Sequence, residues 1–268
     1  MINPAILNFK TYLSETNAYL NSDSALSSLT TAKKDGIDRW FKDLQGFSNG
    51  SYTTYNVWSR LIAIYPMIGG TSTSVAVNAK SPGTYDLTHS GSPTINSNGI
   101  AYNGSSQFSD TGYIPPSDQS TNDLLCVGIH RRDSNDDINA TCGIASGGNT
   151  YFIIRSDNFR SMQMAGNSIV SAAGTLGVNA LWHGSYASTT TANAYRNGVN
   201  IKANSGLTIT NTGNRSFYIG AFHAASSAGY GGANTVDYLW LGSNYNWTDS
   251  EQLFMYNAFN ALQTVLGR

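Results

Sequence analysis

Short runs rich in β-branched and aromatic residues recur from Gly69 onward, and glycine, asparagine and serine separate them. Their spacing of roughly 8 to 15 residues is typical of an antiparallel sandwich and not of alternating βα units. We therefore expect a mainly β chain, folded as an antiparallel jelly-roll β-sandwich. The predicted strands are residues 74–79, 99–103, 124–130, 151–155, 180–188, 193–197, 217–222 and 236–242.

Two local signals add detail to this sandwich. Asn197-Gly198 stands between two alternating runs, a pattern that predicts a type I′ hairpin. Thr248 with Glu251 three residues later is the pattern of a capping box, and a single apolar face follows it. The sequence thus predicts a C-terminal amphipathic helix that closes the sandwich.

The first 65 residues carry helical periodicity instead. Apolar residues at helical spacing predict helices over residues 6–20, 37–44 and 58–65. We expect the second and third to pack on the β core. The first either does the same, packs against copies of itself as in a trimer, or binds another protein. The predicted division is a helical anchoring segment over 1–65 and a sandwich over 66–268.

The charge balance argues against some partners. With 15 Lys plus Arg against 16 Asp plus Glu, the formal net charge is -1, which is not the basic surface that nucleic-acid backbones require. No apolar run approaches the ~20 residues that span a bilayer, and the first residues lack the pattern of a signal peptide. We expect no nucleic acid and no membrane as partners, and synthesis in the cytosol.

The two cysteines, Cys126 and Cys142, flank the segment DSNDD. A hairpin at that segment would bring them nearly opposite each other, where a cross-strand disulfide is conceivable. Two buried free thiols are the favoured alternative.

Three segments in the last third of the chain resemble the concanavalin A-like lectin/glucanase superfamily in its laminin-G-like branch. AYRNGV (194–199) looks like the tyrosine and asparagine-glycine turn of that branch, and RSFYIGAFH (215–223) looks like the strand that follows. Residues 236–256 are similar to its closing strand and short helix. The resemblance implies a lectin-like sandwich.

A second resemblance concerns biological setting. WSRLIAIYPMIGGTSTSVAVNAK (58–80), YDLTHSG (85–91), AYNGSSQFSDTGY (101–113) and the ending LGR look like a module of tailed-bacteriophage structural proteins. This resemblance implies a virion protein that is assembled in the host cytoplasm and contacts other virion proteins through its N-terminal helices.

The residues that catalysis and metal binding need are scarce. The chain contains only two glutamates, Glu15 and Glu251, so the glutamate pair of the related glucanases cannot form. The four histidines lack metal-ligand spacing, and in the acidic segment that begins at Asp133 an isoleucine, Ile138, replaces the glycine of a calcium loop. We therefore expect no enzyme, no catalytic residues, no metal and no cofactor.

Aromatic and amide side chains remain, and these suit sugars, because rings stack on sugar faces and amides pair with hydroxyl groups. The predicted ligand-binding residues are His223, Tyr230, Tyr245 and Trp247. For Tyr245 and Trp247 the alternative is that they fasten the last helix.

The function expected from these observations is a structural component of a phage virion, of the tail-fibre, head-fibre or decoration type, that binds host surface glycans. One rival is a purely architectural virion protein without sugar binding. The other is a polysaccharide depolymerase, which the scarcity of glutamate disfavours.

Overall fold

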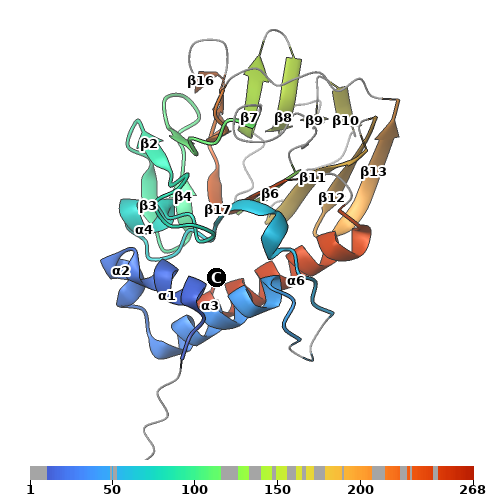
Figure 1. Cartoon of the computed structure of the whole chain (residues 1–268). Helices are drawn as coiled ribbons and strands as arrows, with labels where there is room; N and C mark the ends of the chain where they lie inside the picture. Colours follow the sequence, from blue (N-terminus) through green and yellow to red (C-terminus); the bar gives the residue numbers. More distant parts are fainter. Residues whose placement is uncertain are drawn as a thin grey trace, which may run out of the picture.

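The computed structural model describes residues 11–48, 50, 53–115, 126–132, 140–146, 149–155, 161–164, 167–171, 179–188, 190–206, 215–223, 228–229, 231–243 and 247–268. Within these ranges the chain is mainly β, with helices before the sandwich and one long helix at its end (Figure 1). This confirms the predicted fold class. The strands pair antiparallel, apart from one short parallel contact between His223 and Ile144.

Two sheets form the sandwich. The eight-stranded sheet runs, in spatial order, β13 (Val199–Ser205), β12 (Thr191–Arg196), β11 (Ala180–Ser188), β6 (Cys126–Arg131), β17 (Thr235–Gly242), β4 (Gly99–Ala101) and β3 (Thr94–Asn96), while β1 (Leu61–Tyr65) also pairs with β17. The nine-stranded sheet runs β10 (Asn167–Ser171), β9 (Ser161–Met164), β8 (Asn149–Arg155), β7 (Ala140–Ser146), β14 (Tyr218–Ile219), β5 (Phe108–Asp110) and β2 (Thr88–Ser90), with β15 (Phe222–His223) and β16 (Ala228–Gly229) beside it.

Helices form a third layer on the outside of the eight-stranded sheet. They are α1 (Ser14–Asn21), α2 (Ser24–Ser27), α3 (Thr31–Leu44) and α6 (Asp249–Leu266). In Figure 1 they gather below the strands, and α3 lies beside α6. The shorter helices η1 (Trp58–Arg60) and α4 (Ser72–Ala76) stand in the connections on either side of β1.

The eight-stranded sheet is buried on both faces because two apolar clusters flank it. On β17, Leu239 and Leu241 point into the cluster between the two sheets, while Tyr238 and Trp240 point into the cluster under the helices. Gly128 on the neighbouring strand makes room for the Trp240 indole, since a Cβ there would lie 1.9 Å from its Nε1 atom. A strand with two buried faces reads as one continuous apolar run.

Two predicted elements have the other secondary structure. Residues 61–65 of the predicted helix 58–65 are strand β1, whose Ile64 faces the helices while Tyr65 faces the other sheet. Burial on both faces produced apolar spacing that fits a helix equally well. The predicted strand 74–79 is partly helix α4, which begins at a capping box between Thr71 and Ser74.

The predicted hairpin and final capping box are present. Asn197 and Gly198 both have positive φ, 52° and 76°, as a type I′ turn requires. The Thr248 side chain accepts from the Glu251 backbone N–H, and the Glu251 side chain accepts from the Thr248 backbone N–H. Both cysteines are buried and neither forms a disulfide; Cys126 lies in the eight-stranded sheet and Cys142 in the other, so no hairpin places them opposite each other.

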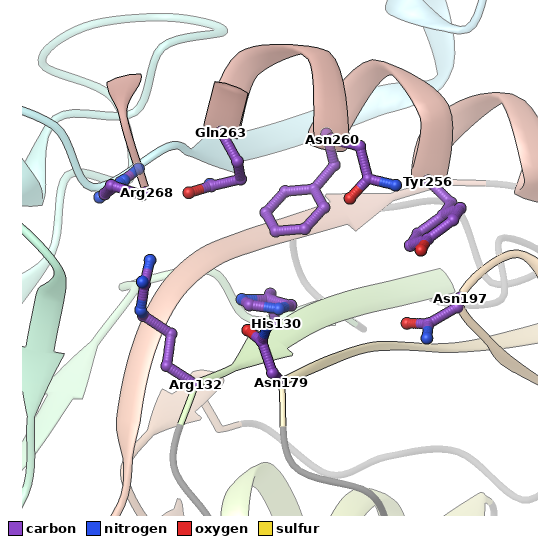
Figure 2. Close-up of a pocket in the computed structure, with 9 residues that line it drawn as sticks. His130, Arg132, Asn179, Asn197, Tyr256, Asn260, Gln263 and Arg268 are labelled. Atoms are coloured by element: carbon purple, nitrogen blue, oxygen red, sulfur yellow. The ribbon is translucent and has the colours of Figure 1, made fainter. Parts of the chain in front are cut away.

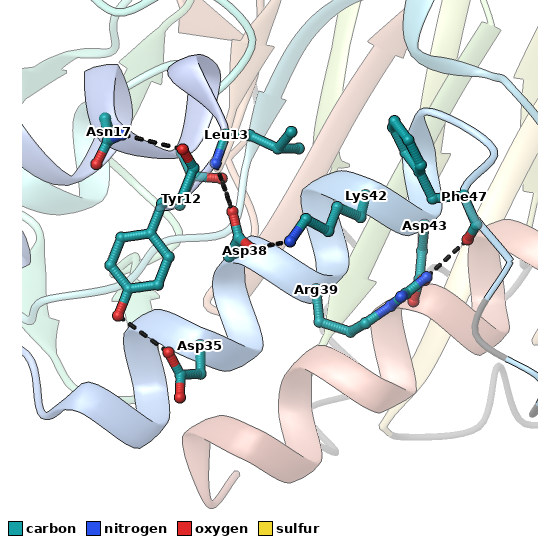
Figure 3. Close-up of polar contacts among 10 residues, drawn as sticks. Tyr12, Leu13, Asn17, Asp35, Asp38, Arg39, Lys42, Asp43 and Phe47 are labelled. Carbon is teal, nitrogen blue, oxygen red and sulfur yellow. Dashed lines mark hydrogen bonds and ion pairs between the residues drawn. The ribbon is translucent and has the colours of Figure 1, made fainter. Parts of the chain in front are cut away.

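A buried carboxylate joins α1 to α3. Asp38 of α3 accepts hydrogen bonds from the backbone N–H of Leu13 (2.8 Å) and the hydroxyl of Thr16 (2.9 Å), and it pairs with Lys42 Nζ (2.6 Å; Figure 3). Burial by itself raises the pKa of Asp38, but these contacts together outweigh burial, and the net pKa lies below its usual value. In this way α1 packs within its own chain, while its binding to other copies or proteins stays a prediction.

None of the helices in the described ranges is long and apolar enough to cross a bilayer.

A buried histidine connects α6 to the sheet beneath it. His183 of β11 is fully buried, and its Nδ1 lies 2.6 Å from Oε1 of Gln252 in α6. An amide oxygen only accepts, so Nδ1 carries the proton. Burial lowers the pKa of His183 from 6.5 to about 4, although the bond to Gln252 raises it somewhat.

The folded protein should therefore lose stability on mild acidification. At pH values between about 4, the pKa of folded His183, and 6.5, its pKa in the unfolded chain, the unfolded chain binds a proton at His183 and the folded chain does not. The free energy of unfolding should fall by about 2 kcal/mol from pH 7 to pH 5, as measured by urea denaturation. In His183→Gln the fall should be smaller. An identical pH dependence in this variant would contradict the assignment.

Candidate functional site

A pocket opens between α6 and the end of the eight-stranded sheet, with a cavity volume of about 150 Å³ (Figure 2). The strands supply its floor and α6 supplies its wall. Two aromatic rings, two arginines, one histidine and four amides line it: Phe259, Tyr256, Arg132, Arg268, His130, Asn179, Asn197, Asn260 and Gln263. Such a mixture of rings and converging polar groups is typical of a binding site for a small polar molecule.

A β-bulge places the carboxylate that organises the pocket floor. The pairing of β17 with β6 shifts between Val236 and Tyr238, which leaves Asp237 as the extra residue. Its side chain is fully buried, lies 2.5 Å from His130 Nδ1 through Oδ1, and accepts from Arg132 Nη1 through Oδ2 (2.9 Å). Both carboxylate oxygens are thus engaged, and they hold His130 and Arg132 at the pocket.

Arg268 lies at the same end of the pocket and forms hydrogen bonds to two connecting segments, at residues 66–67 and at residue 97. Its guanidinium donates to the carbonyl oxygens of Pro66 (3.0 Å), Met67 (3.1 Å) and Ser97 (3.1 Å). Burial lowers the pKa of Arg268, and Arg132 lowers it further while Asp237 raises it. The two arginines are therefore close enough to repel each other.

Gln263 is the pocket residue with the most unusual environment. It is only 7% exposed, yet neither its amide nitrogen nor its amide oxygen has a hydrogen-bond partner within the described part of the chain. Arg268 Nε beside it is also buried without a partner there. Buried polar atoms without partners are costly, so these atoms need a partner from outside the described residues, which a bound water or a ligand atom can supply.

The opposite end of the pocket is neutral. Figure 2 shows Tyr256, Asn260 and Asn197 together at the end away from Arg132 and Arg268. Phe259 lies between the ends and packs against the His130 ring at 4.5 Å between centroids. The pocket thus has a cationic end and an end of amides and an aromatic ring.

The structure does not gather the predicted ligand-binding residues into this pocket. Trp247 is 2% exposed and lies between Trp240 (4.8 Å between centroids) and the Arg60 guanidinium (4.2 Å), where it fastens the start of α6. Tyr230 and Tyr245 lie outside the described residues.

His223 belongs to a stack of rings on the nine-stranded sheet. Its ring lies 4.2 Å from that of Tyr218, which in turn lies 4.5 Å from Phe108, and both pairs are nearly parallel. Its Nδ1 lies 3.2 Å from the carbonyl oxygen of Ser216, which fixes the imidazole. Because Tyr218 covers one face of the ring, His223 offers a sugar less surface than an isolated ring would.

Sequence reasoning missed the pocket residues for a simple reason. In the sequence, His130 is one of four histidines without metal-ligand spacing, and Asp237 is one residue of the predicted strand 236–242. They meet because a bulge and a helix end bring distant segments together, and no local spacing encodes that meeting. No group of His, Cys, Asp and Glu suited to a metal ion occurs among the described residues.

No protein-family model and no curated protein matches this sequence. Among solved structures, Trypanosoma rangeli sialidase in complex with 2,3-difluorosialic acid matches 85% of this chain at 12% identity with a TM-score of 0.56. A mutant of that sialidase displaying trans-sialidase activity matches with a TM-score of 0.54. Domain 4 of a GH43 extracellular arabinanase from Geobacillus stearothermophilus, in complex with arabinotriose, matches 72% of the chain at 16% identity, but its TM-score is only 0.46.

This chain spans 39% of the length of those sialidases. At such low identity the likeness shows the fold alone, which is a β-sandwich.

The expectation that the chain is not an enzyme is wrong, because it was inferred from residue types alone and the fold of this chain occurs within sialidases. The scarcity of glutamate excluded one catalytic pair of one glucanase family. It did not exclude catalysis by other residues.

Replacement of Asp237 tests how the pocket floor is held. Asp237→Asn should lower the free energy of unfolding by about 3 kcal/mol, because it removes the buried negative charge to which His130 and Arg132 are bonded. Arg132→Gln should lower the free energy of unfolding by less than Asp237→Asn does, since the Arg132 side chain is 26% exposed and the contact between Asp237 and His130 remains. Urea denaturation measures both. Equal losses, or a loss in Asp237→Asn below about 1 kcal/mol, would contradict this account of the floor.

Proposed function

We propose that the chain is a glycan-binding β-sandwich protein of a tailed-phage virion, of the tail-fibre, head-fibre or decoration type, which attaches to host surface glycans. The observation that carries the binding part is the buried, unpartnered amide of Gln263 in a pocket rich in amides and rings. The resemblance of residues 58–113 to phage structural proteins supports the virion setting.

The size and lining of the pocket agree with one sugar unit. A cavity of about 150 Å³ encloses a ring the size of benzene, so a pyranose would sit with part of its hydroxyl groups outside the pocket. Asn179, Asn197 and Asn260 offer amide donors and acceptors to hydroxyl groups, while Tyr256 and Phe259 offer apolar surface to a ring face. Binding at a single small site is weak, and many copies on one particle would strengthen it.

Two further candidates follow from specific observations. Hydrolysis of a polysaccharide is favoured by the fold shared with sialidases. In that case Asp237, the carboxylate bonded to His130 and Arg132 at the pocket, is the first residue to test. A purely architectural virion role is favoured by the packing of α1 and α3 along the sandwich, and contacts with other virion proteins or a trimer would use these helices.

Glycan binding should depend on the pocket wall. The purified protein should bind at least one host surface glycan on an array, and Asn260→Ala should weaken that binding by about fivefold, because one hydrogen bond to a hydroxyl is lost. Leu253→Ala is the matched control, since Leu253 is on the same helix but 45% exposed and outside the pocket. An array blank for every host glycan would refute the binding proposal, and release of reducing ends from the bound glycan would show hydrolysis.

The virion setting has a separate measurement. Mass spectrometry of purified phage particles should detect this chain in a fixed ratio to the major capsid protein. Electron microscopy of the same particles should show the sandwich on the outside. Absence of the chain from washed particles would refute this setting and leave the glycan proposal standing.

A further inference from the structure

The cationic end of the pocket holds the guanidinium groups of Arg132 and Arg268 and the side-chain carboxylate of Asp237. Asp237 is the carboxylate bonded there, and its two oxygens already serve His130 and Arg132. Arg268 bonds only to neutral carbonyl oxygens. Asp237 lies near enough to raise the pKa of Arg268, but its oxygens are bonded to other groups, so the Arg268 guanidinium is open to a further anionic partner.

The unpartnered atoms at this end describe the group that would complete it. Arg268 Nε and Gln263 Nε2 are N–H donors, and Gln263 Oε1 is an acceptor. Two N–H donors in a site with two arginines suit a carboxylate, which accepts at both oxygens. The remaining acceptor suits a neighbouring hydroxyl group. A ligand that carries a carboxylate next to a hydroxyl satisfies all three atoms.

The rest of the pocket fits the remainder of such a molecule. Asn197, Tyr256 and Asn260 form the neutral end, and the cavity holds one ring. We infer that this pocket binds an acidic sugar, a uronic acid or similar unit, with its carboxylate at Arg268 and Gln263 and its ring hydroxyls at the amides. This inference rests on the proposed glycan binding and names the class of sugar.

Matched sugars test the charge requirement directly. Glucuronate and galacturonate differ from glucose and galactose only in the carboxylate at carbon six. Calorimetry or ligand-observed NMR with the full chain should show each acid binding about tenfold more tightly than its neutral partner, the effect of charge-assisted hydrogen bonds. Raised salt should reduce this preference. Glucose 6-phosphate is the third probe, and tighter binding of it than of glucuronate would overturn the choice of a carboxylate.

Gln263→Glu is the decisive variant because it places a carboxylate where the ligand's is expected. The wild-type Gln263 amide has no hydrogen bond to lose within the described residues, and the new carboxylate can pair with Arg268 Nε. The melting temperature should rise, and the preference for the acids over their neutral partners should disappear because the new carboxylate repels that of the ligand. Asn260→Asp adds the same charge at the neutral end and should not raise the melting temperature.

The outcomes separate this inference from the proposed function. Equal binding of acid and neutral sugars, or an array positive for neutral glycans alone, would overturn the acidic class and leave glycan binding intact. No binding of any glycan would overturn both. A lower melting temperature of Gln263→Glu with an unchanged preference for acids would overturn the placement of the carboxylate at Gln263 and Arg268.

Discussion

Burial of β17 on both faces is the constraint on which the other layers depend. Leu239 and Leu241 face one way and Tyr238 and Trp240 the other, so neither side of this strand tolerates water. The nine-stranded sheet covers the first side. The second side needs another cover, and the helices from both ends of the chain provide it. The helices are thus part of the fold's core and not an appendage to the sandwich.

The candidate site is a consequence of this covering layer. As α6 crosses the eight-stranded sheet, Phe259 packs on Tyr238 and His130, while Gln263 lies beyond the apolar contact. The bulge at Asp237 turns a carboxylate toward the same end, and it holds His130 and Arg132 in place. A pocket with fixed polar groups therefore forms where the apolar layer ends, which is a common place for binding sites.

The fold and the site speak to function at different levels. The β-sandwich is shared with parts of sialidases, and folds of this kind host both binding and catalysis. Function has to be argued from the pocket, whose unpartnered amide, two arginines and amide-rich end are the basis of the proposed acidic-sugar ligand. His130 lies on β6 and Tyr256, Phe259, Asn260 and Gln263 lie on α6, whereas both arginines follow within two residues of the end of an element.

Local physics explains which features the sequence determined by itself. The asparagine-glycine turn at 197–198, the capping box of α6 and seven of the eight predicted strand segments were predictable because each depends on neighbours within a few residues. Residues 61–65 were misassigned because a strand buried on both sides lacks alternation. The pocket was not predictable at all, since His130, Asp237 and Arg268 are far apart in sequence. The sequence by itself determined the mainly β fold and its closing helix, through local turn, cap and pattern signals. Only the tertiary structure decided where α6 crosses the sheet and which polar groups meet beneath it, because the position of α6 depends on long-range packing of two apolar faces.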